Sequence, residues 1–127
     1  MNPASRWGRL LFDEWERYGL VVSLPILREV LDVITRPELV AKYRGLAERD
    51  IRRVLSLLAN ATIVLPATLP PVCRDPKDDK FIATAVAANA SFLVSEDLDL
   101  LDLGRYESTQ IVDAAAFLSV ILQQETV

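Results

Sequence analysis

The chain has 127 residues, of which 51% are hydrophobic and 25% are charged. This balance is typical of one globular domain with a core of its own, and it excludes disordered, collagen-like and low-complexity chains. No apolar run is long enough to span a membrane, and the first residues lack the apolar segment and cleavage site of a signal peptide. The single cysteine permits no internal disulfide. We therefore expect a cytoplasmic protein with no membrane partner.

The sequence contains no histidine, and this absence removes several classes of chemistry. Ser-His-Asp and Cys-His nucleophile systems are excluded, zinc sites are nearly excluded, and one cysteine cannot hold an iron–sulfur cluster. The chain carries 18 acidic and 14 basic side chains, for a net charge of −4. This negative charge argues against non-specific electrostatic binding of long duplex nucleic acid by the protein, although a small active site could still act on one strand. An enzyme with this composition would use carboxylates, bare or holding a hard cation such as Mg²⁺ or Mn²⁺.

In the first half of the chain, apolar patterning predicts helices around one short strand. Ser5 is a plausible N-cap for a helix that runs through Trp15, and Gly19 is placed to end it. Residues 20–23 form an apolar, β-branched run that predicts a buried strand. A helix then starts near Pro25 and extends to Arg36. One or two further helices are predicted over residues 38–58.

In the second half, strands alternate with helices. Strands are predicted at residues 62–65, 91–95 and 110–112, and helices at 75–90 and after Asp113, which would cap the last one. The acidic, leucine-rich segment 96–104 predicts one helical turn. This order indicates a single α/β domain over residues 1–127, with a short parallel sheet flanked by helices.

Four carboxylates fall where such a sheet binds ligands, at the C-terminal ends of its strands. Glu29 follows the first strand, on the flank of its helix, although it could also face solvent. Asp79 directly precedes an apolar run, so we expect partial desolvation that a cation would offset. Asp97 and Asp99 follow the strand at 91–95 as an Asp-x-Asp pair, whose short side chains suit a metal ion. Gathered like charges favour a cation, and two such ions can activate water for phosphodiester cleavage.

Structural roles can explain several acids equally well. Asp75 with Pro76 is typical of a helix N-cap and first position, and Asp78 could complete a capping-box-like arrangement. Asp99, and more readily Glu96 and Asp102, could belong to a solvated acidic loop that caps a turn.

Taken together, these segments resemble PIN-domain proteins, in particular the toxin components of prokaryotic toxin–antitoxin systems. The resemblance covers nearly the whole chain and rests on residues 72–83, 90–101, 20–31 and 111–118. It implies a three-layer α/β fold and an Mg²⁺- or Mn²⁺-dependent ribonuclease. It further implies Glu29, Asp79 and Asp97 as catalytic and metal-binding acids, and Asp99 as an additional metal ligand. An RNA substrate and an antitoxin protein that occupies the cleft are the implied partners.

The chain departs from this family at its start. Family members usually open with a central strand ending in an Asp-Thr-Asn-type motif, whereas Asn2-Pro3-Ala4-Ser5 resembles the loop that follows it. Either the true start lies upstream, or the natural protein has lost this strand. Without that strand, the strands at 20–23 and 92–95 must close on each other, accept a strand from another chain, or leave a defective fold. Loss of the motif's Asp should weaken metal binding and catalysis, and the exposed strand edges predict association between copies.

Three hypotheses remain at this stage. The chain is a metal-dependent ribonuclease, a non-catalytic PIN-like protein that acts through partner binding, or an unrelated α/β module that binds a small ligand. The third finds no support, because the 4 glycines form no phosphate-binding loop.

Overall fold

The computed structural model describes residues 3–36 and 48–123, and all structural statements concern these residues. The chain opens with helix α1 (Pro3–Gly8), the π-helical turn η1 (Arg9–Asp13) and the 3₁₀ turn η2 (Trp15–Arg17). The expectation that Ser5 is an N-cap is wrong, because Ser5 lies inside α1. Pro3 begins the helix instead, which suits a residue without an N–H in a first turn, where that group would be unpaired.

A first sheet joins two short parallel strands. Strand β1 (Val21–Ser23) leads into helix α2 (Leu24–Ile34), and helix α4 (Glu48–Ala59) leads into strand β2 (Thr62–Val64). Val22 pairs with Ile63 at the centre of the register. The predicted strands and the start of α2 near Pro25 are confirmed. Residues 38–47 of the predicted helical stretch 38–58 lie outside the described residues, and residues 48–58 belong to α4.

A second sheet forms from the C-terminal half. The 3₁₀ turn η3 (Pro76–Asp78) continues into helix α5 (Asp79–Ala88), which is followed by strand β3 (Phe92–Val94) and helix α6 (Leu98–Leu103). Strands β4 (Arg105–Tyr106) and β5 (Thr109–Val112) precede helix α7 (Ala114–Gln123). β5 runs parallel to β3 and antiparallel to β4, a two-residue strand that periodicity did not predict.

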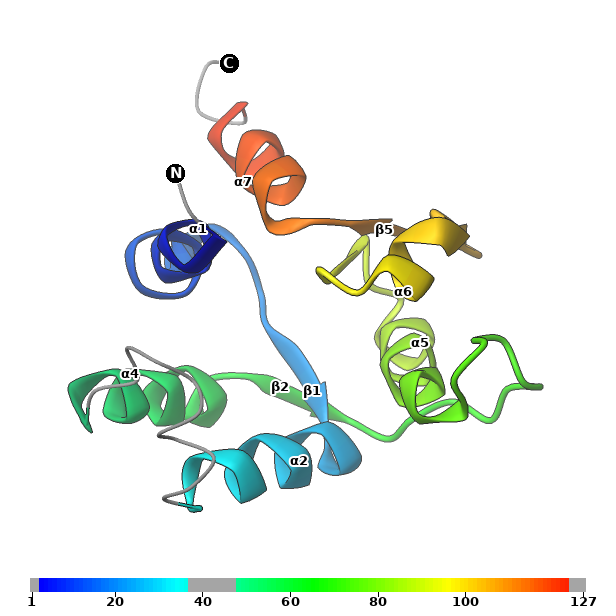
Figure 1. Cartoon of the computed structure of the whole chain (residues 1–127), viewed down its shortest axis with the longest axis horizontal. Coiled ribbons are helices and arrows are strands. Elements are labelled where there is room, and N and C mark those ends of the chain that lie inside the picture. Colours follow the sequence, from blue (N-terminus) through cyan, green and yellow to red (C-terminus); the bar gives the residue numbers. More distant parts are fainter. Residues whose placement is uncertain (1–2, 37–47, 124–127) are drawn as a thin grey trace.

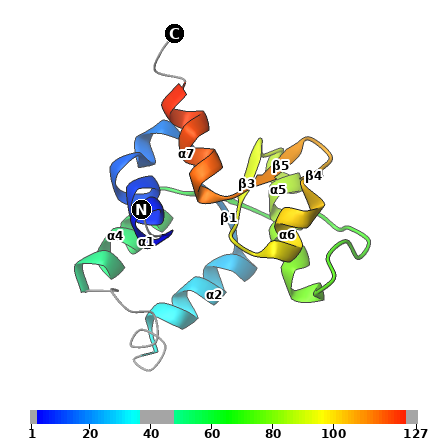
Figure 2. The ribbon, with the colours of Figure 1, turned by 45° about the horizontal axis from the view of Figure 1, so that its top comes forward.

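The five strands form two sheets, and this differs from the single sheet that the sequence predicts. The orders are β1-β2 and β3-β5-β4, so β1 and β3 are not paired. The two groups are separate in Figure 1, and Figure 2 shows β3, β4 and β5 together beside α5 and α6. The expectation that β1 and β3 could close on each other is therefore wrong. Mixed α/β architecture, with short parallel strands packed against helices, is confirmed.

Two apolar clusters hold the helices against the second sheet. One gathers Leu10 with four residues of α7, among them Phe117, whose ring meets those of Tyr18 and Phe92 at 5.6 and 5.4 Å between centroids. The other joins Ile82 of α5, Leu100 of α6 and Ile111 of β5. None of the described helices is both long and apolar enough to cross a membrane.

A buried pair of hydroxyls fastens α5 to β1. Ser23, fully buried at the end of β1, has its Oγ 2.7 Å from Thr84 Oγ1. The Thr84 hydroxyl donates to the Lys80 carbonyl at 2.7 Å, so the Ser23 hydroxyl is the donor of the pair. The bond therefore connects the first sheet to the helix that precedes the second.

We expect Thr84→Val to destabilise the protein more than Ser23→Ala. The valine leaves the buried Ser23 hydroxyl without an acceptor, at about 1–3 kcal/mol, whereas Ser23→Ala removes one net hydrogen bond worth about 1 kcal/mol. Urea unfolding at 25 °C measures both free energies, with the exposed Ser119→Ala as control. Equal losses, or a double variant whose loss is the sum of the single ones, would contradict the coupling.

Candidate functional site

The segment Val72–Lys80 connects an extended stretch to α5, and its first acid is structural. The Asp75 side chain accepts a hydrogen bond from the Lys77 N–H at 3.0 Å, with Pro76 at the first helical position. The predicted N-cap and first-position pair is thus confirmed. Asp78 makes no side-chain capping bond, so the predicted capping-box role for it is wrong.

Asp79 fixes the shape of this segment. Its Oδ1 accepts hydrogen bonds from the backbone N–H of Cys73 at 2.7 Å and of Val72 at 3.3 Å. The Cys73 bond is the main reason why the pKa of Asp79 lies below its usual value. Asp79 is half-buried, as predicted. The compensation for its charge differs from the prediction, since backbone amides rather than a cation supply it.

Cys73 also faces Asp79 with its thiol. Burial, followed by a hydrogen bond to Asp79 and the negative charge of that carboxylate, raises the pKa of the Cys73 thiol to about 12. The thiol is therefore protonated at neutral pH and acts as a donor to Asp79, not as a nucleophile.

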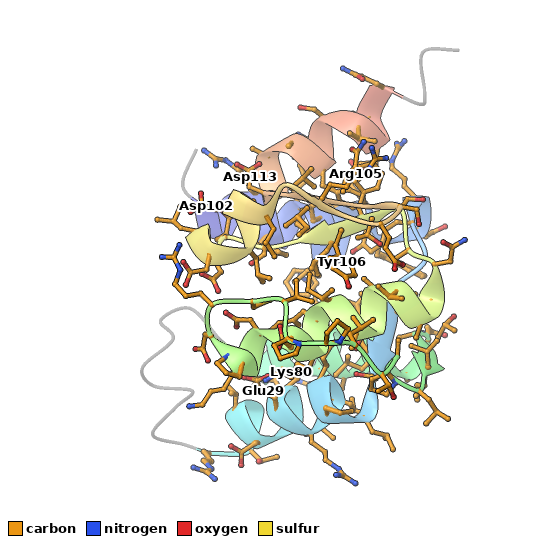
Figure 3. The ribbon with its side chains drawn as sticks, turned by 90° about the vertical axis from the view of Figure 1, so that its right-hand side faces the viewer. Glu29, Lys80, Asp102, Arg105, Tyr106 and Asp113 are labelled. Carbon is orange, nitrogen blue, oxygen red and sulfur yellow. The ribbon has the colours of Figure 1, made fainter. Side chains whose placement is uncertain are left out.

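Glu29 reaches the same segment from α2. Its Oε2 lies 2.7 Å from Lys80 Nζ, and Figure 3 shows the two side chains meeting between α2 and α5. The Lys80 side chain is 26% exposed and that of Glu29 is 52% exposed. Glu29 thus leans toward α5, as expected of a flanking residue, and already holds a cationic partner that the sequence analysis did not identify.

Asp97 follows β3 and caps α6. It accepts a hydrogen bond from the Asp99 N–H at 3.1 Å, and its own N–H donates to Ser95 Oγ at 3.0 Å. The Asp97 side chain also meets Asp78. Burial, and then a hydrogen bond and repulsion from Asp97, raise the pKa of Asp78. Two carboxyl groups from distant parts of the chain therefore lie close together, although the sequence analysis gave Asp78 only a structural role.

Asp99 makes a looser contact with the segment. Its Oδ1 lies 3.7 Å from the Arg74 guanidinium, which is 82% exposed. Of the remaining acids in this region, Glu96 accepts a hydrogen bond from the Ala114 N–H at 3.1 Å and so helps Asp113 to cap α7. Asp102 is exposed on α6. Both observations favour the structural interpretation of Glu96 and Asp102.

All four candidate acids therefore contact the same nine-residue segment. Glu29 meets Lys80, Asp97 meets Asp78, Asp99 meets Arg74, and Asp79 binds the amides of its own segment. Carboxylate oxygens are the donors that Mg²⁺ and Mn²⁺ prefer, so the donor set suits such an ion chemically. In the described part of the chain, however, no group of three or more acidic, cysteine or histidine side chains is spaced to hold a metal.

Sequence reasoning missed the partners of these acids. Lys80, Arg74 and Asp78 were visible only as members of a charged run, and nothing in their spacing showed which acid each would meet.

We expect Asp79→Asn to lower stability at pH 7, with a deficit that shrinks as the pH falls below about 4. The pKa of Asp79 is lowered by folding, so its contribution is full above the unfolded pKa and is lost as the pH falls through the folded one. Urea midpoints from pH 7 to pH 3 measure this, with the exposed Asp102→Asn as control. A deficit of constant size at every pH would show that the carboxylate charge plays no part.

Comparison with known proteins gives one match, to a protein family. No curated protein and no solved structure is significantly similar to the chain. The model of the PIN domain family matches residues 9–99, more than half of the chain, and this span includes all four candidate acids. The family is typically composed of nucleases and is usually metal-dependent. The chain belongs to the PIN domain family.

Proposed function

We propose that this protein is a ribonuclease that cleaves RNA phosphodiester bonds with the help of Mg²⁺ or Mn²⁺. Glu29, Asp79 and Asp97 are the proposed catalytic and metal-binding acids, with Asp99 as a further metal ligand. The observation that carries the proposal is the contact of all four with one segment, Val72–Lys80, inside the span that matches the PIN family.

Asp79, Glu29 and the Lys80 beside it have distinct tasks in this proposal. A bound divalent ion would lower the pKa of water and stabilise the charge that develops on the phosphate. Asp79, already ionised because two amides stabilise its charge, is ready to accept a cation at neutral pH. Glu29 must exchange the Lys80 ammonium for that cation. The freed Lys80 would then stand beside the site with a positive charge available for a phosphate oxygen.

A second candidate is a PIN-like protein without catalysis, which acts by binding a partner. One observation favours it, namely that no three acids in the described residues are spaced for a metal. The two candidates share a scaffold and differ in whether added metal starts RNA cleavage.

We further propose a protein partner of the antitoxin kind and an association between copies of the chain. Co-purification with the product of an adjacent small gene would support the antitoxin partner, and a monomer that purifies alone would count against it.

The association between copies is supported by β2. Its outer edge is unpaired in the described part of the chain, and Ile63 of β2 and Leu65 just after it are 55% and 83% exposed. Edges of this kind favour pairing with another chain.

Cleavage of a panel of single-stranded and structured RNAs should require Mg²⁺ or Mn²⁺ and stop in EDTA. We expect Glu29→Gln, Asp79→Asn and Asp97→Asn each to slow cleavage by about 100-fold or more, because a metal ligand stabilises the transition state by several kcal/mol. Asp32→Asn and Asp102→Asn, exposed acids on α2 and α6, are the matched controls. Circular dichroism separates loss of activity from loss of fold.

The ribonuclease proposal fails if Asp79→Asn and Asp97→Asn cleave RNA as fast as the unaltered protein. Absence of any metal-dependent cleavage by the unaltered protein, with a partner still bound, would favour the non-catalytic candidate instead.

Association should depend on β2. We expect sedimentation to show a dimer or larger species at high protein concentration, and Leu65→Lys to return it to monomer, because a charge on an edge strand blocks pairing. Leu98→Lys, on α6 and 73% exposed, is the control that should leave association unchanged. A monomer at every concentration would contradict the expectation.

A further inference from the structure

A pocket of about 280 Å³, here called the α4 pocket, lies between α4 and the N-terminal turns. Figures 1 and 2 both place α4 and the N-terminal helices on the side of the molecule away from α5 and α6. Arg53, Ser56 and Leu57 line it from one face of α4, and Asn60 follows just after the helix. Pockets of about 300–1,000 Å³ hold drug-sized ligands, so this one suits a smaller molecule with one ring system.

The opposite wall of the α4 pocket contains the π-helical turn η1. Phe12 and Asp13 come from this turn and Trp15 from η2. The Glu14 N–H bonds to the carbonyl of Arg9, five residues earlier, at 2.9 Å and closes the wide turn. Patterning predicted an ordinary helix through this stretch. Turns of this kind are rare and often occur at functional sites, so η1 is a second indication that the pocket binds a ligand.

Aromatic and cationic groups in the α4 pocket favour a flat ligand. The Arg53 guanidinium lies over the Phe12 ring, 5.2 Å from its centroid. Trp15, which lines the same pocket, is 43% exposed, so a face of its indole is open to a partner. Planar rings stack on both tryptophan and guanidinium groups. The pocket can therefore hold a flat ring against Trp15.

Two opposite charges of the α4 pocket do not neutralise each other. Glu14, next to the pocket, pairs with both Arg9 and Arg17. By contrast, neither Asp13 nor Arg53 has an ion-pair partner within the described ranges, although both line the pocket. A ligand that lies between them can accept hydrogen bonds from the guanidinium and donate hydrogen bonds to the carboxylate.

These groups disfavour three other classes of ligand. A cation would be repelled by Arg53, which already lies over the Phe12 ring. An anion would be repelled by Asp13 and by the carbonyl end of α4, where Asn60 lies. A wholly apolar molecule would desolvate both charged side chains without a hydrogen bond in return. A neutral, planar ring with donors and acceptors on its edge meets all of these conditions.

We propose that the α4 pocket binds a single guanine base. Guanine is the base that presents two adjacent donors, N1–H and the N2 amino group, to a carboxylate such as Asp13. On the neighbouring edge, its O6 and N7 accept a bidentate contact from a guanidinium such as Arg53. Trp15 would stack on the ring, while the sugar and phosphate remain in solvent. The proposal does not rest on the ribonuclease activity.

Titration of the whole chain with GMP, followed through its two tryptophan indole N–H resonances, tests the proposal. We expect the Trp15 resonance to shift, whereas that of Trp7, which packs against the cluster around Leu10, is the internal reference. AMP, CMP and UMP should bind at least about tenfold more weakly, because none offers both the donor pair and the acceptor pair. EDTA is present throughout, so binding is measured apart from any metal-dependent cleavage.

Matched variants locate the guanine base in the α4 pocket. Asp13→Asn and Arg53→Lys should each weaken GMP binding at least about tenfold, because the first adds a donor against N1–H or N2 and the second loses the planar fork. Glu16→Gln and Arg52→Lys are the controls, since both residues are exposed neighbours outside the pocket lining. If Arg53→Lys disturbs the packing of α4, Asp13→Asn decides the question, because Asp13 is exposed.

A guanine base could come from a free nucleotide or from a single strand of RNA. An oligouridylate with one central guanosine separates the two sources, with plain oligouridylate as its control. Binding of the guanosine oligomer at least about tenfold tighter than GMP would indicate a base within RNA, and equal binding would indicate a free nucleotide. Both results support the pocket.

Three results would overturn the proposal. The first is equal binding of the four nucleotides, and the second is GMP binding that Asp13→Asn leaves unchanged. The third is the absence of a Trp15 shift with both GMP and the guanosine oligomer, which would leave the contact between Arg53 and Phe12 as a structural link between α4 and η1.

Discussion

The Asp79 carboxylate is the interaction on which the rest of the site depends. By accepting the amides of Val72 and Cys73, it folds the segment before α5 into a fixed turn. Every other candidate acid contacts that turn or the first turn of α5, through Arg74, Asp78 or Lys80. The cost of bringing these negative charges together is offset by amides and cationic side chains in the present arrangement. Among the described residues, no trio of acids is spaced for a metal.

The division into two sheets affects the site, because the strands of both sheets position its acids. β1 leads into the helix that carries Glu29, and β3 leads into the cap formed by Asp97. These two strands are held relative to each other by α5, through the buried bond from Ser23 to Thr84, and not by backbone pairing. The spacing of the acids therefore depends on a helix that packs against both sheets.

Sequence patterns predicted the elements that depend on neighbouring residues in the chain. Short β-branched runs predicted β1, β2, β3 and β5, and the Asp75-Pro76 pair predicted the turn that begins at residue 76. They missed β4, because two residues carry no periodicity, and they overextended the helix at 75–90, because left-handed Asn89 ends α5 early. In the site, Glu29, Asp97 and Asp99 became candidates because they follow predicted strands, and Asp79 because it precedes an apolar run. Their partners could not, since the contact between Glu29 and Lys80 spans 51 residues of chain and depends on packing. The use of backbone amides to hold Asp79 depends in the same way on the path of the preceding loop.

The central claim is that Glu29, Asp79, Asp97 and Asp99 can share a divalent cation. Anomalous diffraction from crystals of the protein grown with Mn²⁺ tests it most directly, because the signal locates the ion independently of any assay. The account predicts a manganese peak at bonding distance, about 2.0–2.3 Å, from carboxylate oxygens of at least three of the four, with Lys80 moved off Glu29. A peak bound to other residues, or none at saturating Mn²⁺ with the Lys80 contact intact, would contradict it.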